Sequence, residues 1–267
     1  MLYFVATPIG NLKDISYRAI EILKAVDYIF CEDTRHSQVF LNHYEIKKPL
    51  RSYHKFNERE SAEKICELLE SGSSVAVISD AGMPVISDPG NILAQVLIEK
   101  GLEFTVVPGA CAFLPALILS GFPSDRFTFI GFLPEKKKDA IKLLETYENI
   151  PSSLIFYMPP HDIDEVVKTI ESVLGNRKAV AVREITKIYE ERIEFYLSDG
   201  YFGEKRGEFV LIVDGAKEKN ENVDLVAEVN TLINLGLSKM DAIKQVAKEQ
   251  NIKKNELYKI IIDSENE

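Results

Sequence analysis

Short apolar runs alternate with amphipathic stretches through the first half of the chain. The apolar runs at residues 2–6, 28–31, 75–79 and 103–107 have the length and composition of buried strands. Between them, apolar residues recur at helical spacing after Ser16 or Asp14 as a cap, over residues 60–71 before Gly72, and over about residues 91–100. This alternation predicts a parallel sheet covered by helices on both faces. Residues 35–59 have weak periodicity, which predicts a short helix and an exposed loop.

Three loops rich in Pro and Gly each follow a predicted strand. They lie at residues 8–10, 82–84 and 108–109. The carboxyl ends of parallel strands meet at one edge of a sheet, so these loops should lie close together. The sequence therefore predicts a ligand site at this edge. Asp80 ends its strand among small residues and should face the cleft, and Gly82 allows a close backbone approach.

The pattern changes at residues 120–125, where Gly, Pro and Asp predict a domain junction. Beyond it, strands are predicted at residues 126–132, 153–158, 179–185, 193–197 and 208–213, and helices at about 138–147 and 163–174. A polar segment at residues 218–222 predicts a linker. Three short amphipathic helices follow, the second with Ser238 and Asp241 as a capping pair. They indicate a helix-turn-helix unit, with a helical cap on the second domain as the alternative.

The predicted organisation is thus two α/β domains, at residues 1–120 and 121–217, and a C-terminal helical domain at residues 222–267. The net charge of −10 is against binding nucleic acid by bulk attraction. Two segments are nevertheless basic: residues 35–59 carry six Lys and Arg against two Glu, and residues 236–259 carry six Lys against three acidic residues. They are compatible with local phosphate contacts or with solvated helix faces.

Several classes of protein are not favoured by the sequence. There is no long apolar run and no basic leader, so we expect a cytoplasmic protein without a membrane partner. The three cysteines are widely spaced in apolar surroundings, which indicates small buried side chains. The phosphate-binding, dinucleotide-binding and zinc-binding motifs GxxxxGK[ST], GxGxxG and HExxH are absent, so no metal site is predicted.

Three further polar clusters invite an interpretation. Asp88, Pro89 and Gly90 have the pattern of a helix start, with Asp88 as N-cap and Pro89 at the first helical position. The cluster at residues 32–35, Glu-Asp-Thr-Arg, fits a substrate-facing role somewhat better than an internal salt bridge. The cluster at residues 183–190 suits interdomain ion pairing and an active cleft equally well.

Several of these motifs together resemble a known family. The segments are ATPIGNLKDIS near the start, CEDTR at residues 31–35, SDAGMPVISDPG at residues 79–90, PGACA at residues 108–112 and REITKIYEE at residues 183–191. They resemble the tetrapyrrole-methylase superfamily of S-adenosylmethionine-dependent methyltransferases. Within it they are similar to the branch that 2′-O-methylates a cytidine in the decoding region of small-subunit (16S) ribosomal RNA. Met83 departs from the Thr that is usual in that branch, which puts a hydroxyl contact there in doubt.

The resemblance implies two α/β domains with the cofactor, S-adenosyl-L-methionine, in the cleft between them. It also implies a homodimer that acts on small-subunit ribosomal RNA, within the assembled small subunit. By position, the residues that would bind the cofactor are Pro8, Gly10, Asp80, Ala81, Gly82, Met83, Pro84, Pro108, Gly109, Ala110, Tyr157 and Met158.

A ribose hydroxyl is a poor nucleophile at neutral pH, so a general base would assist its methylation. The candidates are Asp33, His54 and Glu184, which the sequence does not rank. The residues expected to contact RNA are Arg35, Arg51, Lys55, Lys244, Lys248, Lys253 and Lys254. Two other functions stay open at this point: a small-molecule methylase of tetrapyrrole precursors, and a non-catalytic RNA-binding or assembly protein.

Overall fold

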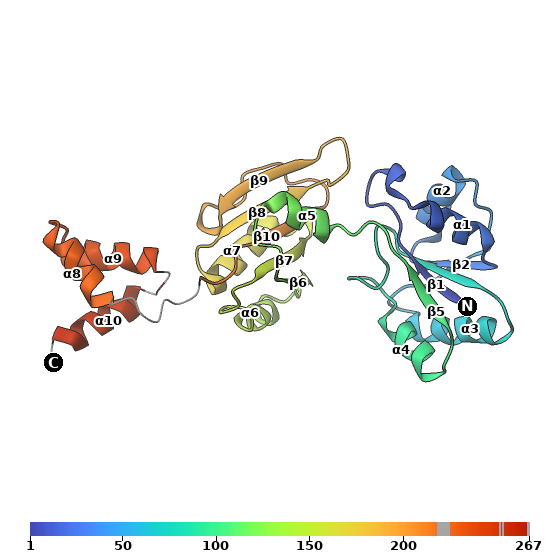
Figure 1. The fold of residues 1–267 in the computed structure, drawn as a ribbon, viewed down its shortest axis with the longest axis horizontal. Coiled ribbons are helices and arrows are strands. Elements are labelled where there is room, and N and C mark those ends of the chain that lie inside the picture. Colours follow the sequence, from blue (N-terminus) through green and yellow to red (C-terminus); the bar gives the residue numbers. More distant parts are fainter. Residues whose placement is uncertain (218–224, 251, 253, 266–267) are drawn as a thin grey trace.

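The computed structural model describes residues 1–217, 225–250, 252 and 254–265, and contains two sheets and a separate group of helices (Figure 1). The first sheet has the strand order β3-β2-β4-β1-β5, and all its strand pairs are parallel. Its strands are β1 (Leu2–Val5), β2 (Tyr28–Cys31), β3 (Leu50–Ser52), β4 (Val75–Ile78) and β5 (Phe104–Val107). The predicted parallel sheet is confirmed.

Helices cover both faces of the first sheet because its central strands are apolar throughout. All four residues of β4 are buried. One face packs on α3 (Glu58–Glu70) and α4 (Asn91–Glu99), the other on α1 (Tyr17–Ala25) and α2 (Thr34–His43). A short 3-10 helix, η1 (Leu12–Asp14), precedes α1. Ser16 caps α1, and Gly72 follows the end of α3 with a φ of +90°, both as predicted.

The second sheet is mixed, with the order β6-β7-β10-β8-β9. Only the pair β6–β7 is parallel among the described strands of this sheet. Its strands are β6 (Phe127–Phe132), β7 (Ser153–Met158), β8 (Lys178–Arg183), β9 (Glu191–Tyr196) and β10 (Phe209–Val213). One face packs on α6 (Lys137–Glu145) and α7 (Ile163–Leu174). Two 3-10 helices, η2 (Pro160–Asp162) and η3 (Leu197–Asp199), complete this unit.

The other face of the second sheet is covered by α5 (Phe113–Ser120), a helix that the pattern does not predict. Ala116 and Leu117 of α5 are buried in the same cluster as Val180 and Ile212 of that sheet. The chain therefore passes from one sheet to the other between β5 and α5, ahead of the junction expected at residues 120–125.

The C-terminal helices form a small unit with its own core. They are α8 (Leu225–Asn234), α9 (Lys239–Glu249) and α10 (Lys254–Glu265). Val229, Ile243 and Leu257, one from each helix, are fully buried against one another. The Ser238 hydroxyl accepts a hydrogen bond from the Asp241 amide, as the predicted capping pair requires. Among the described residues, no helix combines the length and the apolar character that crossing a bilayer requires.

Candidate active site

The loops after β1, β4 and β5 meet at one edge of the first sheet, as predicted. Thr7 and Gly82 exchange backbone hydrogen bonds of 2.8 and 3.1 Å, which join the first loop to the second. Gly82 has a φ of +86°, and a Cβ there would lie 3.1 Å from Ile9 and 3.4 Å from the Ala110 carbonyl oxygen. Glycine is needed because side-chain-bearing residues rarely adopt this φ and the neighbouring loops leave little room.

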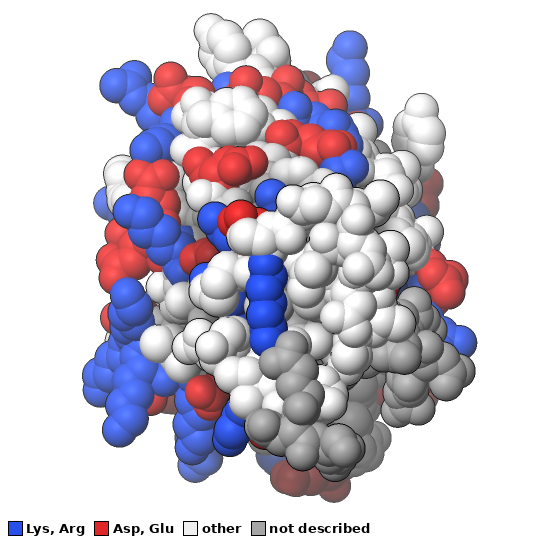
Figure 2. All heavy atoms as spheres, turned by 90° about the vertical axis from the view of Figure 1, so that its left-hand side faces the viewer, with Lys and Arg blue, Asp and Glu red and all other residues white. Residues whose placement is uncertain are grey.

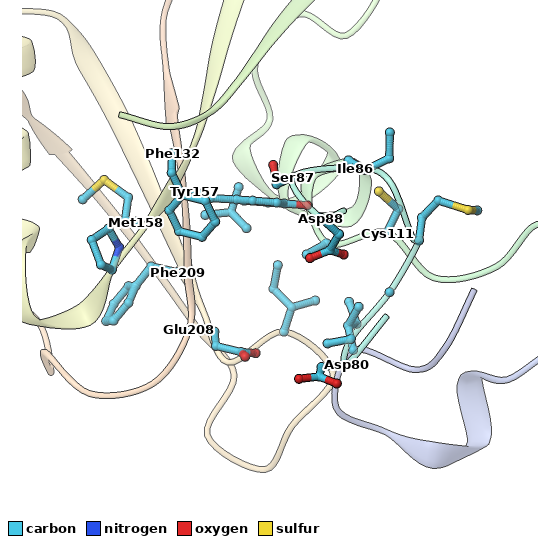
Figure 3. Close-up of a pocket in the computed structure, with 18 residues that line it drawn as sticks. Asp80, Ile86, Ser87, Asp88, Cys111, Phe132, Tyr157, Met158, Glu208 and Phe209 are labelled. Atoms are coloured by element: carbon cyan, nitrogen blue, oxygen red, sulfur yellow. The ribbon is translucent and has the colours of Figure 1, made fainter. Parts of the chain in front are cut away.

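A cavity of about 420 Å³ lies between these loops and the second domain (Figure 3). Its volume is within the range of about 300–1,000 Å³ that is typical of small-molecule sites. The first domain contributes Ile9, Asp80, Ala81, Gly82, Met83, Ile86, Ser87 and Asp88 to its lining. The remaining lining residues are Cys111, Ala112, Phe132, Tyr157, Met158, Pro159, Ile185, Glu208, Phe209 and Val210. Mostly apolar walls thus surround three carboxylates, those of Asp80, Asp88 and Glu208.

A second, smaller cavity of about 250 Å³ adjoins the first and shares Ile9, Asp80, Ala81 and Glu208 with it. Its remaining lining is more polar and includes His36, Ser37 and Lys187. The two cavities therefore form one cleft, with an apolar lobe and a polar lobe that meet at Asp80 and Glu208.

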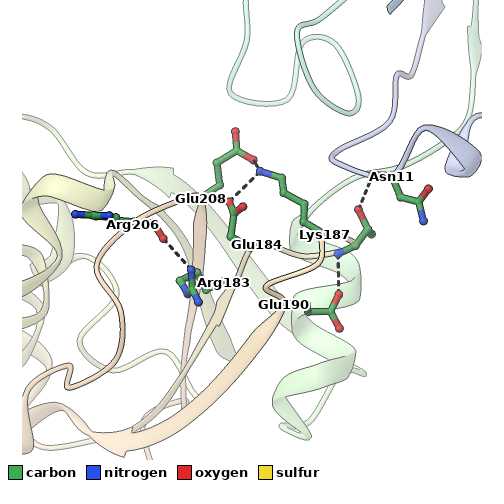
Figure 4. A network of polar contacts seen from close by, with 8 residues as sticks. Asn11, Arg183, Glu184, Lys187, Glu190, Arg206 and Glu208 are labelled. Atoms are coloured by element: carbon green, nitrogen blue, oxygen red, sulfur yellow. Dashed lines mark hydrogen bonds and ion pairs between the residues drawn. The ribbon is translucent and has the colours of Figure 1, made fainter. Parts of the chain in front are cut away.

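A loop of the second domain contributes Lys187 to the lining of the polar lobe, and Figure 4 shows the polar contacts of this loop. Lys187 Nζ lies 2.9 Å from Glu184 Oε1 and 3.0 Å from Glu208 Oε2, so the cation is held by two carboxylates. The same loop reaches the first domain, where the Asn11 amide donates to Thr186 Oγ1 at 3.0 Å. The cluster predicted at residues 183–190 therefore links the domains by a hydrogen bond and supplies Lys187 to the cleft.

The predicted cofactor residues divide into two groups by position. Those that line the cleft are Pro8, Gly10, Asp80, Ala81, Gly82, Met83, Tyr157 and Met158. The other four, Pro84, Pro108, Gly109 and Ala110, are absent from the lining of either lobe, and their chain neighbours Cys111 and Ala112 line it instead.

The three predicted general bases stand outside the lining of the cleft. Asp33 caps α2, is hydrogen-bonded to the Arg35 side chain at 3.0 Å, and these bonds lower its pKa to about 2. Glu184 accepts from Lys187 Nζ and from the Glu208 amide, both at 2.9 Å, and these contacts lower its pKa despite some burial. His54 Nδ1 is buried and has no hydrogen-bond partner in the described part of the chain.

The interpretation of Asp88 as a helix cap is wrong. The helix α4 begins at Asn91, and its N-cap is Gly90. The capping acceptor comes from α3 instead: Glu58 Oε1 accepts from the Gly90 amide at 2.8 Å and from the Ile92 amide at 3.3 Å. Pro89 accordingly stands before the helix. Asp88 points into the apolar lobe, where Figure 3 shows its carboxylate facing the cavity.

Acidic groups gather on one side of this lobe. Burial, and then the charges of Glu32 and Asp80, raise the pKa of Asp88 to about 7. The pKa of Glu32 is also raised, by burial and by Asp80. Tyr157 and Cys111 have raised pKa values for the same first reason, burial. The site therefore favours a positively charged occupant, because a cation would offset the repulsion between these carboxylates.

The residues predicted to contact RNA lie on the surface, apart from one that is outside the described residues. Arg35 is exposed and paired with Asp33, and the Arg51 guanidinium stacks 4.5 Å above the Tyr28 ring. Lys55 is exposed in the turn before α3. Lys244, Lys248 and Lys254 line an open groove of about 980 Å³ between the second domain and α9. Lys253 lies outside the described part of the chain.

Three more positively charged side chains line the same groove: Arg177 and Lys178 of the second domain, and Lys217 shortly after its last strand. Asp199 and Asp214 line it as well. Figure 2 views the end of the molecule formed by the C-terminal helices, where Lys and Arg side chains gather at the lower left. The groove thus has a local excess of positive charge in a chain whose net charge is negative.

The sequence model of the tetrapyrrole (corrin/porphyrin) methylases matches residues 1–199. The chain belongs to the tetrapyrrole methylase family. A protein named ribosomal RNA small subunit methyltransferase I from Halalkalibacterium halodurans is 41% identical over 97% of this chain and 93% of its own length. Its namesake from Bacillus subtilis is 42% identical over 97% of this chain and 92% of its own length. The family resemblance found in the motifs is confirmed.

A solved structure extends the likeness to the fold. Uroporphyrin-III C-methyltransferase from Thermus thermophilus, in complex with S-adenosylhomocysteine, has a TM-score of 0.56 to this chain. The two are 16% identical, and the match covers 79% of this chain and 96% of that one. The cofactor of this methylase family is S-adenosylmethionine, and the cleft fits it: aromatic and apolar walls suit an adenine ring, and the carboxylates suit the positive groups of the donor.

Proposed function

We propose that this protein transfers the methyl group of S-adenosylmethionine to the ribose 2′-oxygen of a cytidine in the decoding region of small-subunit (16S) ribosomal RNA. The observation that carries the proposal is the two-lobed cleft between the domains, because it combines a donor-sized apolar lobe with a polar lobe that contains His36 and Lys187. The relatives named as small-subunit ribosomal RNA methyltransferases support the choice of substrate. Such a substrate would place the protein in the cytoplasm.

The donor would be held in the apolar lobe. Tyr157, Met158 and Phe209 offer apolar surface for the adenine ring, and Asp80 offers a carboxylate to the positive end of the donor. The backbone from Ala81 to Met83 lies against the cavity and can approach the donor closely at Gly82. In the loop after β5, Cys111 and Ala112 would contact the donor. The residues that would shape the loops without contacting the donor are Pro84 after β4 and Pro108, Gly109 and Ala110 after β5.

The donor supplies an activated methyl group on a positively charged sulfur. The main task of the protein is therefore to hold the ribose hydroxyl in line with the carbon–sulfur bond that breaks, with little water between them. The hydrogen bond from the Asn11 amide to Thr186 links the two walls of the cleft and would help to hold the reacting groups in place. Orientation of this kind can contribute about 7–11 kcal/mol to lowering a barrier. The ion-paired Lys187 stands where a phosphate beside the target ribose could exchange with its carboxylate partners.

The RNA would be held at two places on the surface. Near the cleft, Arg35, Arg51 and Lys55 would contact phosphates. Farther away, the groove with Lys244, Lys248 and Lys254 would bind the sugar-phosphate backbone of the RNA. We include Lys253 among these contacts because it adjoins Lys254 in the sequence. Binding through phosphates releases counterions, so affinity for RNA should fall steeply with salt.

We also propose that the protein acts as a homodimer on assembled small subunits. Exposed apolar side chains follow one another from the edge strand β5 through α5 to the edge strand β6: Val106, Leu114, Ile118 and Phe127. Exposed apolar surface of this kind is typical of interfaces. Sedimentation of the wild type and of Ile118→Glu would test it, and a monomeric wild type would contradict it.

The function is tested by incubating purified protein and labelled donor with unmethylated small subunits, followed by nucleoside analysis. A labelled 2′-O-methylcytidine is the expected product. Label in a base, or in a tetrapyrrole precursor supplied in parallel, would refute the proposal. Isothermal titration with S-adenosylmethionine tests the enzyme function by itself, because a non-catalytic RNA-binding protein has no need to bind the donor.

A further inference from the structure

The three general-base candidates from the sequence are poorly placed to accept the ribose proton. Asp33 and Glu184 are ionised and stabilised by the cations of Arg35 and Lys187, and both contacts lower their pKa. A carboxylate held in this way is a weak proton acceptor. Neither of them, nor His54, lines the cleft.

Asp88 differs from these residues in its contacts. Among the described residues, no hydrogen bond or ion pair to its carboxylate is found, although it lies beside the amino end of α4, where an Asp commonly serves as a cap. Glu58 occupies that position through its bonds to the Gly90 and Ile92 amides. Glu58 Oε1 also accepts from the Tyr53 hydroxyl at 3.1 Å, which holds it in place. The capping function is therefore filled from α3, and the Asp88 carboxylate is left free.

The loop before α4 has an unusual backbone conformation on both sides of Asp88. Val85 and Ser87 have φ angles of +77° and +65°, a region that residues with a side chain seldom adopt, and Gly90 has a φ of +139°. Such conformations persist only where the surroundings enforce them. In this loop Ser87 and Asp88 both line the cavity, and the Asp88 carboxylate faces it (Figure 3).

We infer that Asp88 is the general base of the methyl transfer, which accepts the proton of the ribose hydroxyl as its oxygen is methylated. The inference rests on the proposed function, because it presumes a hydroxyl as the acceptor of the methyl group. It assigns a catalytic role to a residue of the cofactor cleft whose carboxylate faces the cavity with no partner of its own.

The surroundings of Asp88 suit a base that works near neutral pH. Its pKa is raised to about 7, chiefly by burial and then by the charges of Glu32 and Asp80. Cys111 and Tyr157 line the same lobe, and both are neutral at this pH because burial raises their pKa values. Glu208 lines the same lobe from the second domain. A base is most effective when its pKa lies near the working pH.

The step balances without a further reactant. The hydroxyl oxygen forms a bond to the methyl carbon while the carbon–sulfur bond breaks, and the electron pair of that bond stays on sulfur. The hydroxyl proton passes to the Asp88 carboxylate. The neutral acid then releases this proton to solvent after the products leave, which restores the carboxylate.

The test compares the wild type with Asp88→Asn, which keeps the shape but cannot accept the proton. Single-turnover methylation of unmethylated small subunits is measured at saturating donor from pH 5.5 to 8.5, a range of about three units chosen around the pKa. For the wild type the rate should rise about tenfold per pH unit below the pKa of Asp88 in the donor complex and level off above it, and the positive charge of the donor should bring that pKa below about 7. Asp88→Asn should be slower by about 10²- to 10⁴-fold at pH 8, with no such rise.

Donor affinity, measured by isothermal titration, gives a readout that does not depend on turnover. Asp88→Asn should still bind S-adenosylmethionine, with a loss of about tenfold or less, which corresponds to one pKa unit of interaction. Asp88→Glu should retain a pH-dependent rate. The matched control is Asp125→Asn, the same change at an exposed carboxyl group outside the cleft, which should leave rate and affinity unchanged.

Two results would overturn the assignment. One is a rate for Asp88→Asn that equals the wild-type rate at saturating donor. The other is a loss confined to donor affinity, which would make Asp88 a donor-binding residue. The proposed function is judged separately by the wild-type product: label outside the ribose would refute that function, whereas label in the ribose with an unaffected variant would refute only the role of Asp88.

Discussion

The raised pKa of Asp88 predicts that Asp88→Asn makes the protein more stable at pH 8. When the pKa of a carboxyl group is higher in the folded chain than in the unfolded chain, ionisation of that group lowers the stability of the folded chain. This loss is complete at a pH above the pKa in the folded chain. The asparagine side chain has nearly the same shape and carries no charge. Removing the charge therefore removes the cost while the loop and the cavity stay in place.

The magnitude follows from the size of the shift. The pKa rises from 3.8 to about 7, and about three units at about 1.4 kcal/mol each give a ceiling of about 4 kcal/mol. The carboxylate faces an open cavity, so water screens part of this interaction. We expect about 2 kcal/mol of added stability for the variant at pH 8, half of the ceiling.

The direction of the pH dependence is fixed by proton binding. Between about pH 3.8 and pH 7 the folded wild type binds more protons at Asp88 than the unfolded chain, so its stability falls as the pH rises through this window. The advantage of the variant should therefore be near zero at pH 4 and full at pH 8. Urea unfolding, followed by circular dichroism at both pH values, measures the free energy of unfolding of each protein. Subtracting the wild-type value from the variant value at each pH removes the contributions of the other titrating groups.

A variant that is less stable than the wild type at pH 8, or a difference that is the same at both pH values, would refute this reasoning. Asp125→Asn is again the control, because Asp125 is exposed and lies outside the cleft, so its replacement should leave the stability nearly unchanged.

Three further predictions concern the framework of the site. Glu58→Ala should destabilise the protein by about 1–3 kcal/mol in urea unfolding, because it leaves the Gly90 and Ile92 amides at the amino end of α4 without this acceptor. Gly82→Ala should cost about 1–3 kcal/mol and weaken donor binding in isothermal titration, because alanine disfavours a φ of +86°; unchanged affinity would contradict the close approach. Arg35→Ala should weaken binding to small subunits in a filter assay while donor affinity stays the same, since Arg35 lies outside the cleft.

The fold was largely predictable because its strongest signals are local. Apolar runs gave four of the five strands of the first sheet, and β7 and α7 coincide with their predicted ranges. Two elements lack such a signal. The strand β3 is three residues long, lies at an edge and is mostly exposed, so it shows no alternation. The helix α5 is apolar almost all round and contains Pro115, so it has no polar face to reveal its period.

The cleft was predictable to the extent that adjacent strands determine it. The parallel order β4-β1-β5 brings three Pro/Gly loops together, and their sequence alone placed Asp80 and Gly82 there. Asp88 was misread because the same residues, Asp-Pro-Gly, also suit a helix start. The choice between the two depends on Glu58, which lies 32 residues before Gly90 and reaches it only in the folded chain.

The free energy stored around Asp88 has a consequence for donor binding. Burial and the charges of Glu32 and Asp80 disfavour the ionised form of Asp88, and a positively charged donor in the same lobe would offset that repulsion. If the donor lowers the pKa of Asp88 from about 7 by one unit, binding at pH 7 releases about 0.4 proton. Isothermal titration in buffers with different ionisation enthalpies measures this release, and Asp88→Asn should abolish it. A release that persists in the variant would show that another group titrates. A release confined to the wild type would mean that the donor itself ionises the base before the hydroxyl arrives.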